Sequence, residues 1–154
     1  KNSHFVVLDS DKPRENMIND TQRSWLEKDL AKNKKENTFV FFHEPAYPVS
    51  SKIGESLSVN NKDRNALWDI LVRHRVTAVF SGHEHIHSRK NINGVYQFVI
   101  GNTQSFNHDA PKPGMAEYSY VGPHFAIVTV DGKKINVKIY KTDGVQINSF
   151  DFTK

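Results

Sequence analysis

The sequence predicts an α/β fold in which a strand–helix–strand–helix–strand segment is followed by antiparallel strands. Three short apolar runs, separated by two segments with helical periodicity, indicate parallel strands joined by crossover helices. The later part of the chain instead contains three dipeptides that are typical of hairpin turns, Asn93-Gly94, Asp131-Gly132 and Asp143-Gly144. This change indicates that the chain passes from a parallel sheet into antiparallel strands.

The first strand and the first helix come early in the chain. Residues 5–8 form a continuous apolar run closed by a polar turn, which is typical of a strand buried on both faces. Between residues 21 and 32 apolar side chains recur at helical spacing, and Asp20 or Thr21 can cap the first turn. The buried face expected for this helix consists of Trp25, Leu26, Leu30 and Ala31.

Two further strands and a second helix complete the parallel part. Residues 38–42 form a second buried strand ending at His43, and a polar loop follows as far as Asn60. Asn60 or Asn61 can cap the second helix, and residues 76–80 form the third strand. The apolar face expected for this helix consists of Ala66, Leu67, Trp68, Ile70 and Leu71.

The last part of the chain alternates apolar and polar residues. Residues 125–130, 135–140 and 145–150 show this period of two, which predicts strands with one face on the core and one toward water. The stretch 101–123 has no clear periodicity and is predicted to be a loop. We therefore expect residues 1–154 to form one domain.

Composition excludes several classes of function. Of the 154 residues 37% are apolar, and no apolar stretch approaches the ~18 residues that a membrane span needs. The absence of cysteine excludes disulfides, thiolate zinc sites and cysteine nucleophiles. The net charge of +4 is spread along the chain, so that binding of nucleic acid is not indicated.

Histidines stand where two of the predicted strands end. His43 ends one buried strand, and His83 and His85 follow the end of another. Because ligands of open α/β sheets bind at this edge, we expect these imidazoles to converge. His83, His85 and His87 alternate, so that an extended backbone would place all three on one face and turn Glu84, a structural residue, to the other. Imidazole is a typical ligand of zinc, copper, iron and nickel.

Two motifs give this pattern a family resemblance. Residues 41–47, Phe-Phe-His-Glu-Pro-Ala-Tyr, and residues 82–85, Gly-His-Glu-His, resemble the last two of the five motifs of calcineurin-like metallophosphoesterases, which include purple acid phosphatases. The resemblance implies that His43 and His83 bind one metal ion and His85 a second. The cofactors would be two divalent or trivalent ions, iron, manganese or zinc, and the substrate a phosphoester.

The three earlier motifs of the family are missing. The sequence contains neither an Asp-x-His nor a Gly-Asp pair, and Asn107-His108-Asp109 lacks the preceding glycine of the third motif and follows the other motifs, so that we interpret it as a loop. The chain therefore resembles the C-terminal portion of a larger metallophosphoesterase domain, half of its β-sandwich. We expect it to be inactive alone, with no catalytic residue of its own, and to associate with the N-terminal half or a second copy.

Three residues close to the motifs are candidates for substrate binding. Tyr47, His87 and Arg89 closely follow the residues of the two histidine motifs, and arginine can hold a phosphate through two parallel hydrogen bonds. Surface solvation is the competing interpretation for Arg89. Two alternatives to the enzyme stay open: a non-catalytic metal- or protein-binding module with the same fold, and adventitious metal binding by the alternating histidines.

Overall fold

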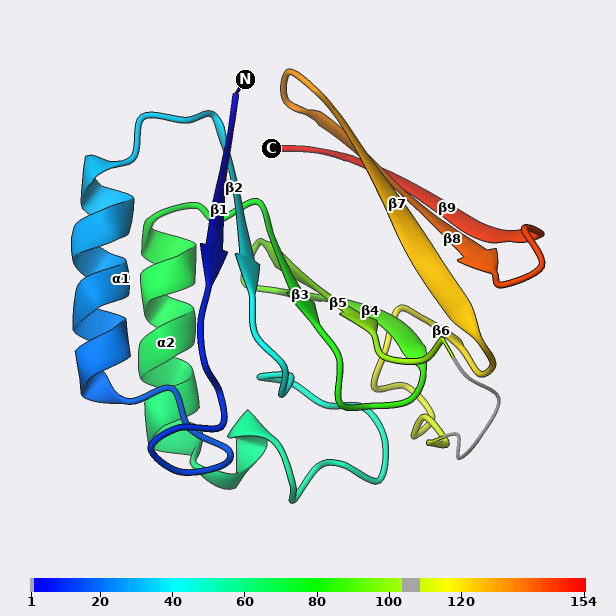
Figure 1. Cartoon of the computed structure of the whole chain (residues 1–154), viewed down its shortest axis with the longest axis horizontal. Coiled ribbons are helices and arrows are strands. Elements are labelled where there is room, and N and C mark those ends of the chain that lie inside the picture. Colours follow the sequence, from blue (N-terminus) through cyan, green and yellow to red (C-terminus); the bar gives the residue numbers. More distant parts are fainter. Residues whose placement is uncertain (1, 104–108) are drawn as a thin grey trace.

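The computed structural model describes residues 2–103 and 109–154, which form two β-sheets and two long helices (Figure 1). The helices are α1 (Asp20–Lys32) and α2 (Asn61–Arg73), with a short 3-10 helix at Leu57–Val59. The strands are β1 (Ser3–Val7), β2 (Asn37–Phe41), β3 (Ala78–Ser81), β4 (His87–Ile92), β5 (Val95–Ile100), β6 (Tyr118–Tyr120), β7 (His124–Asp131), β8 (Lys134–Lys141) and β9 (Gln146–Thr153).

The larger sheet has six strands in the order β1-β2-β3-β5-β4-β6. Strands β1, β2, β3 and β5 run parallel to one another, and β4 pairs antiparallel with both β5 and β6. The strand–helix–strand–helix–strand order predicted from the sequence is confirmed. As parallel neighbours, β2 and β3 end at the same edge of the sheet.

Helix α1 begins one residue earlier than the sequence predicts. Its cap is Asn19, whose side chain accepts a hydrogen bond from the amide of Gln22 at 3.0 Å. The prediction that Trp25 is buried is wrong, since its side chain is 51% exposed. Arg23 takes a place on the buried side instead, because Asp63 of α2 pairs with its guanidinium at 3.1 Å. An ion pair between the two helices thus replaces an apolar contact.

Helix α2 agrees more closely with its prediction. The side chain of Asn60 caps it by accepting a hydrogen bond from the amide of Asp63. Its buried residues are Leu67, Trp68, Ile70 and Leu71, while Ala66 is exposed. Together with α1 it covers one face of the larger sheet, and the core between them includes Val6, Val40 and Val79 from the strands. An apolar core therefore joins the helices to the larger sheet.

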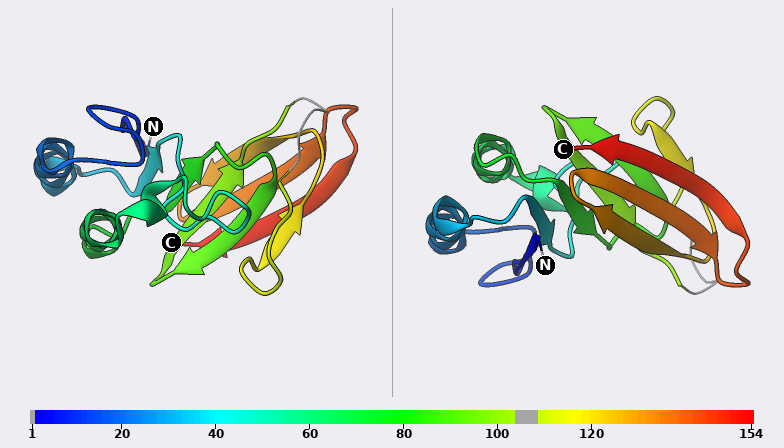
Figure 2. Two further views of the ribbon diagram at one scale, coloured as in Figure 1. Left: turned by 90° about the horizontal axis from the view of Figure 1, so that it is seen from below. Right: turned by 90° about the horizontal axis from the view of Figure 1, so that it is seen from above.

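The second sheet consists of β7, β8 and β9, all antiparallel, as predicted. It lies on the side of the larger sheet away from the helices (Figure 2). Ile135, Val137 and Ile139 of β8 pack in a second core with Phe39 and Phe98 of the larger sheet. The predicted fold class is therefore confirmed in both of its parts.

Two predictions about individual strands are wrong. The stretch 101–123 is not loop throughout, because Tyr118–Tyr120 forms β6 by pairing with β4. Strand β1 is not buried on both faces: Val6 is buried, but Phe5 is 64% exposed and Val7 is 75% exposed. The helices cover one side of β1, and among the described residues no layer covers the other.

Within the described residues, no helix is long and apolar enough to cross a membrane.

Candidate metal centre

His43 and His83 come together at the edge where the parallel strands end. His43 follows β2 and His83 follows β3, and their ring centroids are 5.2 Å apart with the planes at 80°. The amide of Gly82 donates a hydrogen bond to the carbonyl of His43 at 3.0 Å, which ties the two strand ends together. The expected convergence of these two imidazoles is therefore present.

The backbone and the ring of His83 are both held in place. Its φ of 64° is uncommon for a residue other than glycine, and such conformations gather at functional sites. Its Nε2 lies 2.6 Å from the backbone carbonyl of Glu55. Because a carbonyl can only accept, Nε2 must carry the proton, and in the neutral ring Nδ1 is left with the lone pair. Nδ1 is therefore the nitrogen of His83 that can bind a metal.

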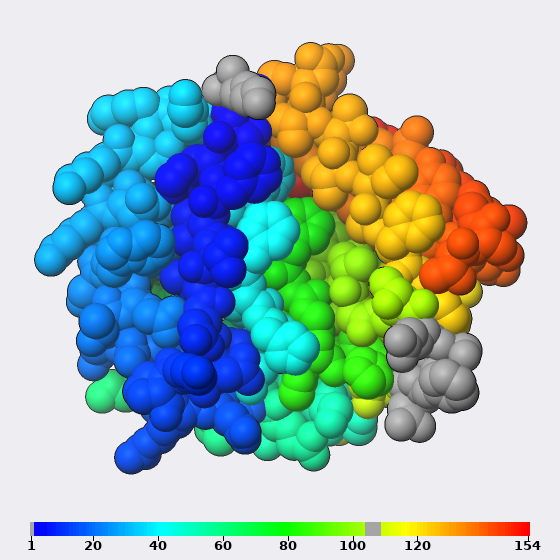
Figure 3. Space-filling model, viewed as in Figure 1, coloured from blue at the N-terminus to red at the C-terminus, as the bar shows by residue number. Residues whose placement is uncertain are grey.

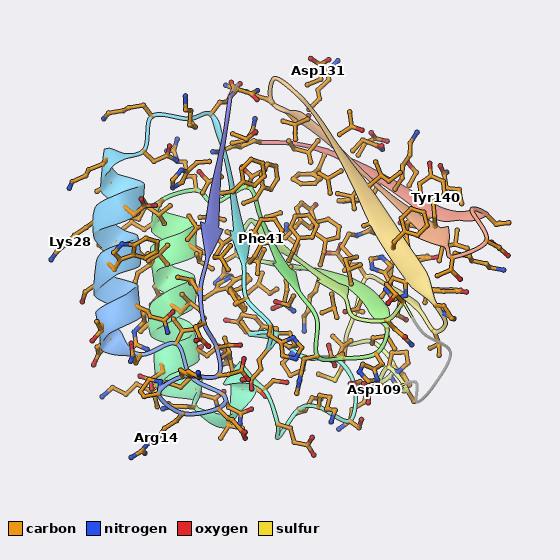
Figure 4. All side chains as sticks on the ribbon, in the orientation of Figure 1. Arg14, Lys28, Phe41, Asp109, Asp131 and Tyr140 are labelled. Carbon is orange, nitrogen blue, oxygen red and sulfur yellow. The ribbon has the colours of Figure 1, made fainter. Side chains whose placement is uncertain are left out.

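His85 is exposed and is held through its backbone. Its amide donates a hydrogen bond to Oδ2 of Asp109 at 2.7 Å, and Oδ1 of the same carboxylate accepts one from the hydroxyl of Ser51, also at 2.7 Å. Figure 4 shows Asp109 beyond the strand ends, on the side where these loops meet. The loops after β2 and before β6 thus both support the backbone of His85.

The side chain of Glu84 is fully buried, unlike the exposed side chain of the neighbouring His85. One oxygen of its carboxylate, Oε1, accepts hydrogen bonds from the amides of Val49 and Ser50, each at 2.7 Å. Burial raises the pKa of Glu84, and the hydrogen bonds from Ser50 and Val49 oppose that rise. A side chain at Gly101 would collide with the Glu84 carbonyl, so that the close packing here needs glycine. The structural role predicted for Glu84 agrees with these contacts.

A second carboxyl group lies directly beside His43. Glu44 is 3% exposed, and burial raises its pKa to about 7, with Asp11 and Glu15 nearby adding to the effect. The Glu44 amide donates a hydrogen bond to the hydroxyl oxygen of Ser10 at 3.1 Å. The turn after β1 is thereby fixed against the end of β2, close to the two histidines.

The sequence of this region matches a known family. Residues 2–87, more than half of the chain, match the calcineurin-like phosphoesterases. The chain belongs to the calcineurin-like phosphoesterase family. The resemblance inferred from the two histidine motifs is therefore confirmed. A comparison with curated proteins finds no matching sequence.

Three solved structures share the fold of this chain. Purple acid phosphatase PPD1 from yellow lupin (Lupinus luteus) seeds is 16% identical with a TM-score of 0.79, and the match covers 98% of this chain and 31% of the phosphatase. GAP50, described as the anchor in the inner membrane complex of Plasmodium, is 17% identical with a TM-score of 0.78 over 98% of this chain and 49% of GAP50. PhoD is 13% identical with a TM-score of 0.67 over 98% and 38%. The chain thus spans a third to a half of the length of these proteins.

Members of the calcineurin-like phosphoesterase family generally bind divalent metals, and the histidines fit part of such a site. Neutral imidazoles are suitable ligands for zinc, iron or manganese. In His83 the contact with the Glu55 carbonyl uses Nε2, which leaves the lone pair of Nδ1 for a metal. Within residues 2–103 and 109–154, however, no group of three or more His, Asp or Glu side chains is close enough together to hold an ion. The described residues therefore supply only part of the ligands that a metal ion needs.

The three predicted substrate-binding residues each have a partner within the fold. The ring of Tyr47 packs edge-on against Trp68 of α2 at 5.0 Å, with the guanidinium of Arg64 4.6 Å from its centroid. Arg89 lies 3.6 Å over the ring of Phe150 and pairs with a carboxylate of the loop before β6, at 3.2 Å. Both side chains therefore have structural partners on other parts of the fold.

His87 does not share a face with His83 and His85, as the sequence predicted, but lies inside the fold. Residues 83–86 form bends rather than an extended strand, so that the expected alternation of three histidines on one face is wrong. His87 is 1% exposed, and its Nδ1 lies 3.0 Å from the Val99 carbonyl inside the fold. The ring of His124 lies 5.9 Å away. A substrate contact by His87 stays a prediction, but it would require this buried ring to become accessible.

Sequence reasoning missed the groups that support the histidines. The carbonyl of Glu55 and the carboxylate of Asp109 come from loops distant in the sequence, and no spacing rule relates them to His83 or His85. The interpretation of Asn107-His108-Asp109 as a loop concerns two residues, 107 and 108, that lie outside the described residues. Asp109 itself is described, and its contact with the backbone of His85 gives it a place in the site.

Proposed function

We propose that this chain supplies His43, His83 and His85 to the two-metal centre of a phosphoester hydrolase. The observation that carries the proposal is the convergence of the His43 and His83 rings, 5.2 Å apart at the ends of adjacent parallel strands. Membership of a phosphoesterase family supports the reaction class. The substrate would be a phosphorylated compound, whose negative oxygens can contact two cations at once.

Each residue has a definite task in this proposal. His43 and His83 would hold one ion, the latter through Nδ1, and His85 would bind the other. Two such ions would supply positive charge to the phosphoryl oxygens as the bond to phosphorus breaks. The carbonyl of Glu55 would keep the His83 ring in the tautomer that leaves Nδ1 unprotonated, as outer-shell partners of metal-binding histidines do.

The 154-residue chain would not perform the reaction by itself. It lacks the Asp-x-His, Gly-Asp and Gly-Asn-His motifs that would supply a bridging carboxylate and a proton donor, and it spans 31% of the yellow lupin phosphatase. We propose that the missing ligands come from an N-terminal half of the same domain, or from a second copy. The metals would be iron, manganese or zinc.

The test separates binding of metal from turnover. We expect titration calorimetry of the 154-residue chain with Zn²⁺ or Mn²⁺ to detect weak binding that His43→Ala and His83→Ala each reduce at least tenfold. His74→Ala removes an imidazole that pairs with Glu27 away from the site, and it serves as the matched control. Hydrolysis of an aryl phosphate should be absent with this chain and present with a longer polypeptide that contains the three missing motifs.

Two results would contradict the proposal. Equal binding of metal by wild type, His43→Ala and His83→Ala would remove these histidines from the site. Metal-dependent hydrolysis by the 154-residue chain alone would overturn its dependence on further ligands.

A non-catalytic module is the second candidate. The incomplete ligand set within the described residues favours it, and GAP50, described as an anchor, has a similar fold. If the longer polypeptide bound metal but hydrolysed no phosphoester, or if its upstream sequence lacked the three motifs, this second candidate would replace the first.

A further inference from the structure

The end of the molecule opposite the histidines has a basic surface. Arg75 follows α2, Lys133 lies in the turn between β7 and β8, and Lys154 follows β9. Figure 1 places the C-terminal end and the β7–β8 turn at this end, away from the loops that follow β2 and β3, and in Figure 3 the atoms of that turn stand at the same end. Folding thus brings together cations that are far apart in the sequence.

Lys154 is fixed next to the other two cations. Its amide donates a hydrogen bond to the Lys133 carbonyl at 3.0 Å, and its Nζ donates one to the Glu36 carbonyl. Partial desolvation lowers the pKa of Lys154. The Glu36 carboxylate opposes this effect, and the positive charges of Arg75 and Lys133 add to it. Because the three cations repel one another at close range, an anion placed among them would be bound favourably.

A cavity of about 280 Å³ opens between these cations and the end of α2. Tyr96 of β5 and Phe152 of β9 form part of its wall, with their ring centroids 4.8 Å apart. Figure 2 shows the C-terminal end beside α2 in both views. An apolar recess with a few polar groups is the usual form of a small-molecule site, and such sites begin at roughly 300 Å³. The other lining side chains that matter here are Arg75, Lys154, Val72, Val76 and Val95.

The backbone at Arg75 has a conformation that favours glycine. Its φ is 52°, and it follows His74, the C-cap of α2. The Val76 amide donates a hydrogen bond to the Leu71 carbonyl, and the Arg75 amide donates one to the Val72 carbonyl, each at 2.9 Å. In this arrangement, the Schellman motif, the position of Arg75 is usually occupied by glycine. Arginine here therefore lowers stability relative to glycine, so its side chain needs another explanation.

Capping of α2 does not account for the Arg75 side chain. Cations near a helix C-terminus commonly bind its last carbonyl groups. The carbonyls of Ile70, Leu71 and Val72 already accept hydrogen bonds from backbone amides. Among the described residues no ion pair involves Arg75. Its guanidinium is therefore available for a ligand in the cavity.

We propose that this cavity binds a small organic anion with a planar apolar body, such as an aromatic carboxylate or an aromatic phosphate monoester. The anionic group would lie between Arg75 and Lys154, because a guanidinium can hold two oxygens through parallel hydrogen bonds. The apolar body would lie against Tyr96 and Phe152. The site goes beyond the proposed hydrolysis, because Tyr96 pairs with the start of β3 whereas His83 follows its end.

A small anion fits this surface better than a nucleic acid. A nucleic acid strand follows a groove whose positive charges track its repeated phosphates. Here Arg75 and Lys154 share one recess, and carboxylates interrupt the surface around it. Glu36 lies beside Lys154, and Asp131, labelled in Figure 4, stands at the β7–β8 turn. The positive charge is therefore confined to the cavity and does not form a track.

NMR titration of the metal-free 154-residue chain tests the proposal, after a chelator has been added and dialysed away. We expect benzoate or phenyl phosphate to bind with a dissociation constant on the order of 1 mM, which is typical of ligands of this size. Binding should shift the amide signals of Asn93, Gly94 and Thr153, which line the cavity. Inorganic phosphate and benzyl alcohol, each lacking one half of the ligand, should bind at least tenfold more weakly. The tighter of the two probes identifies the anionic group.

Arg75→Gly separates binding from folding. It should weaken binding of the tighter probe at least fivefold, while the melting temperature stays the same or rises by up to about 3 °C, because glycine is favoured at this φ. Lys28→Gln removes one positive charge from the exposed surface of α1 and is the matched control, with an affinity within about twofold of wild type. His43→Ala should also leave the affinity unchanged, so the test is independent of the metal centre.

Three outcomes would overturn the proposal. Equal affinity of wild type and Arg75→Gly would remove the guanidinium from the site. Inorganic phosphate that binds as tightly as phenyl phosphate would indicate an effect of surface charge alone. Binding of a short DNA duplex that phenyl phosphate does not displace would make a polyanion the ligand. None of these results affects the metal-binding test of the histidines.

Discussion

Two pairs of histidines occupy opposite environments in this protein. His43 and His83 lie at the edge of the larger sheet, where one is exposed and the other half-buried. His87 and His124 lie between β4 and the start of β7, at 1% and 0% exposure, with their rings 5.9 Å apart. The residue type is the same in the two pairs, so burial is the first feature that separates a candidate ligand from a part of the core.

The hydrogen bonds of the two groups differ accordingly. His87 and His124 each direct Nδ1 to a nearby backbone carbonyl, of Val99 at 3.0 Å and of Gly122 at 2.7 Å. His83 directs Nε2 to a carbonyl and leaves Nδ1 for a ligand at the sheet edge. A structural histidine thus donates its hydrogen bond inside the fold, whereas a candidate ligand holds its ring with one nitrogen and exposes the other at the sheet edge.

The largest expected effect concerns removal of a buried ring. His87→Ala should lower the free energy of unfolding by about 3 kcal/mol, because it leaves a cavity beside Tyr118 and His124 and removes the donor to the Val99 carbonyl. His43→Ala, at the exposed edge, should change it by less than about 0.5 kcal/mol. Urea unfolding followed by circular dichroism measures both. Similar losses for the two variants would break the distinction between the groups.

Acidification should have the next largest effect, again through His87. Burial lowers the pKa of His87 to about 4, whereas the unfolded chain has the ordinary value of about 6.5. Below pH 6.5 the unfolded chain therefore binds a proton that the folded chain does not, so the free energy of unfolding decreases as the pH is lowered. From pH 6.5 to 5 the free energy of unfolding therefore falls by about 1.6 kcal/mol.

A variant isolates that contribution from other titrating groups. His87→Asn keeps a donor near the position of Nδ1 but does not titrate, so the difference in unfolding free energy between wild type and variant should shrink as pH falls. Measurement in the presence of a chelator excludes metal at the neighbouring site. The raised pKa of Glu44 acts in the opposite direction, but it is common to both proteins and cancels. A difference that is constant from pH 6.5 to 5 would contradict the assignment.

The sequence predicted much of the fold because its signals are local. The apolar runs of β2 and β3, the capping by Asn60 and the hairpin dipeptides each depend on a few neighbouring residues. The failures are tertiary in origin. Trp25 has helical spacing for burial, but Arg23 takes that side because its ion-pair partner, Asp63, lies on α2.

The candidate site could be predicted in part for the same reason. His43 and His83 are placed by strand ends, which the sequence marks. His87 could not be separated from His85 by spacing, because the bends at residues 83–86 break the alternation. The positive φ of His83 and the carboxylate of Asp109 depend on loops that only the folded chain brings together.

The smallest expected effect concerns Glu84, which joins the two loops that carry the histidines. Its Oε1 accepts hydrogen bonds from the amides of Val49 and Ser50, and Glu84→Gln keeps an oxygen there while removing the charge. Hydrogen bonds to charged acceptors are stronger than neutral ones, but burial disfavours the Glu84 charge, so the stability of the variant should differ from wild type by no more than about 1 kcal/mol. The amides of Val49 and Ser50 should exchange with solvent about fivefold faster, measurable by NMR, if local opening governs exchange.

Glu117→Gln, at an exposed carboxylate that accepts a hydrogen bond from the Asn91 amide, is the control and should leave the exchange of both amides unchanged. Equal exchange in wild type and Glu84→Gln would mean that the loop bearing Val49 is held by other contacts, such as that of its carbonyl with the Lys112 amide at 2.7 Å, and that the buried carboxylate does not brace the histidine corner.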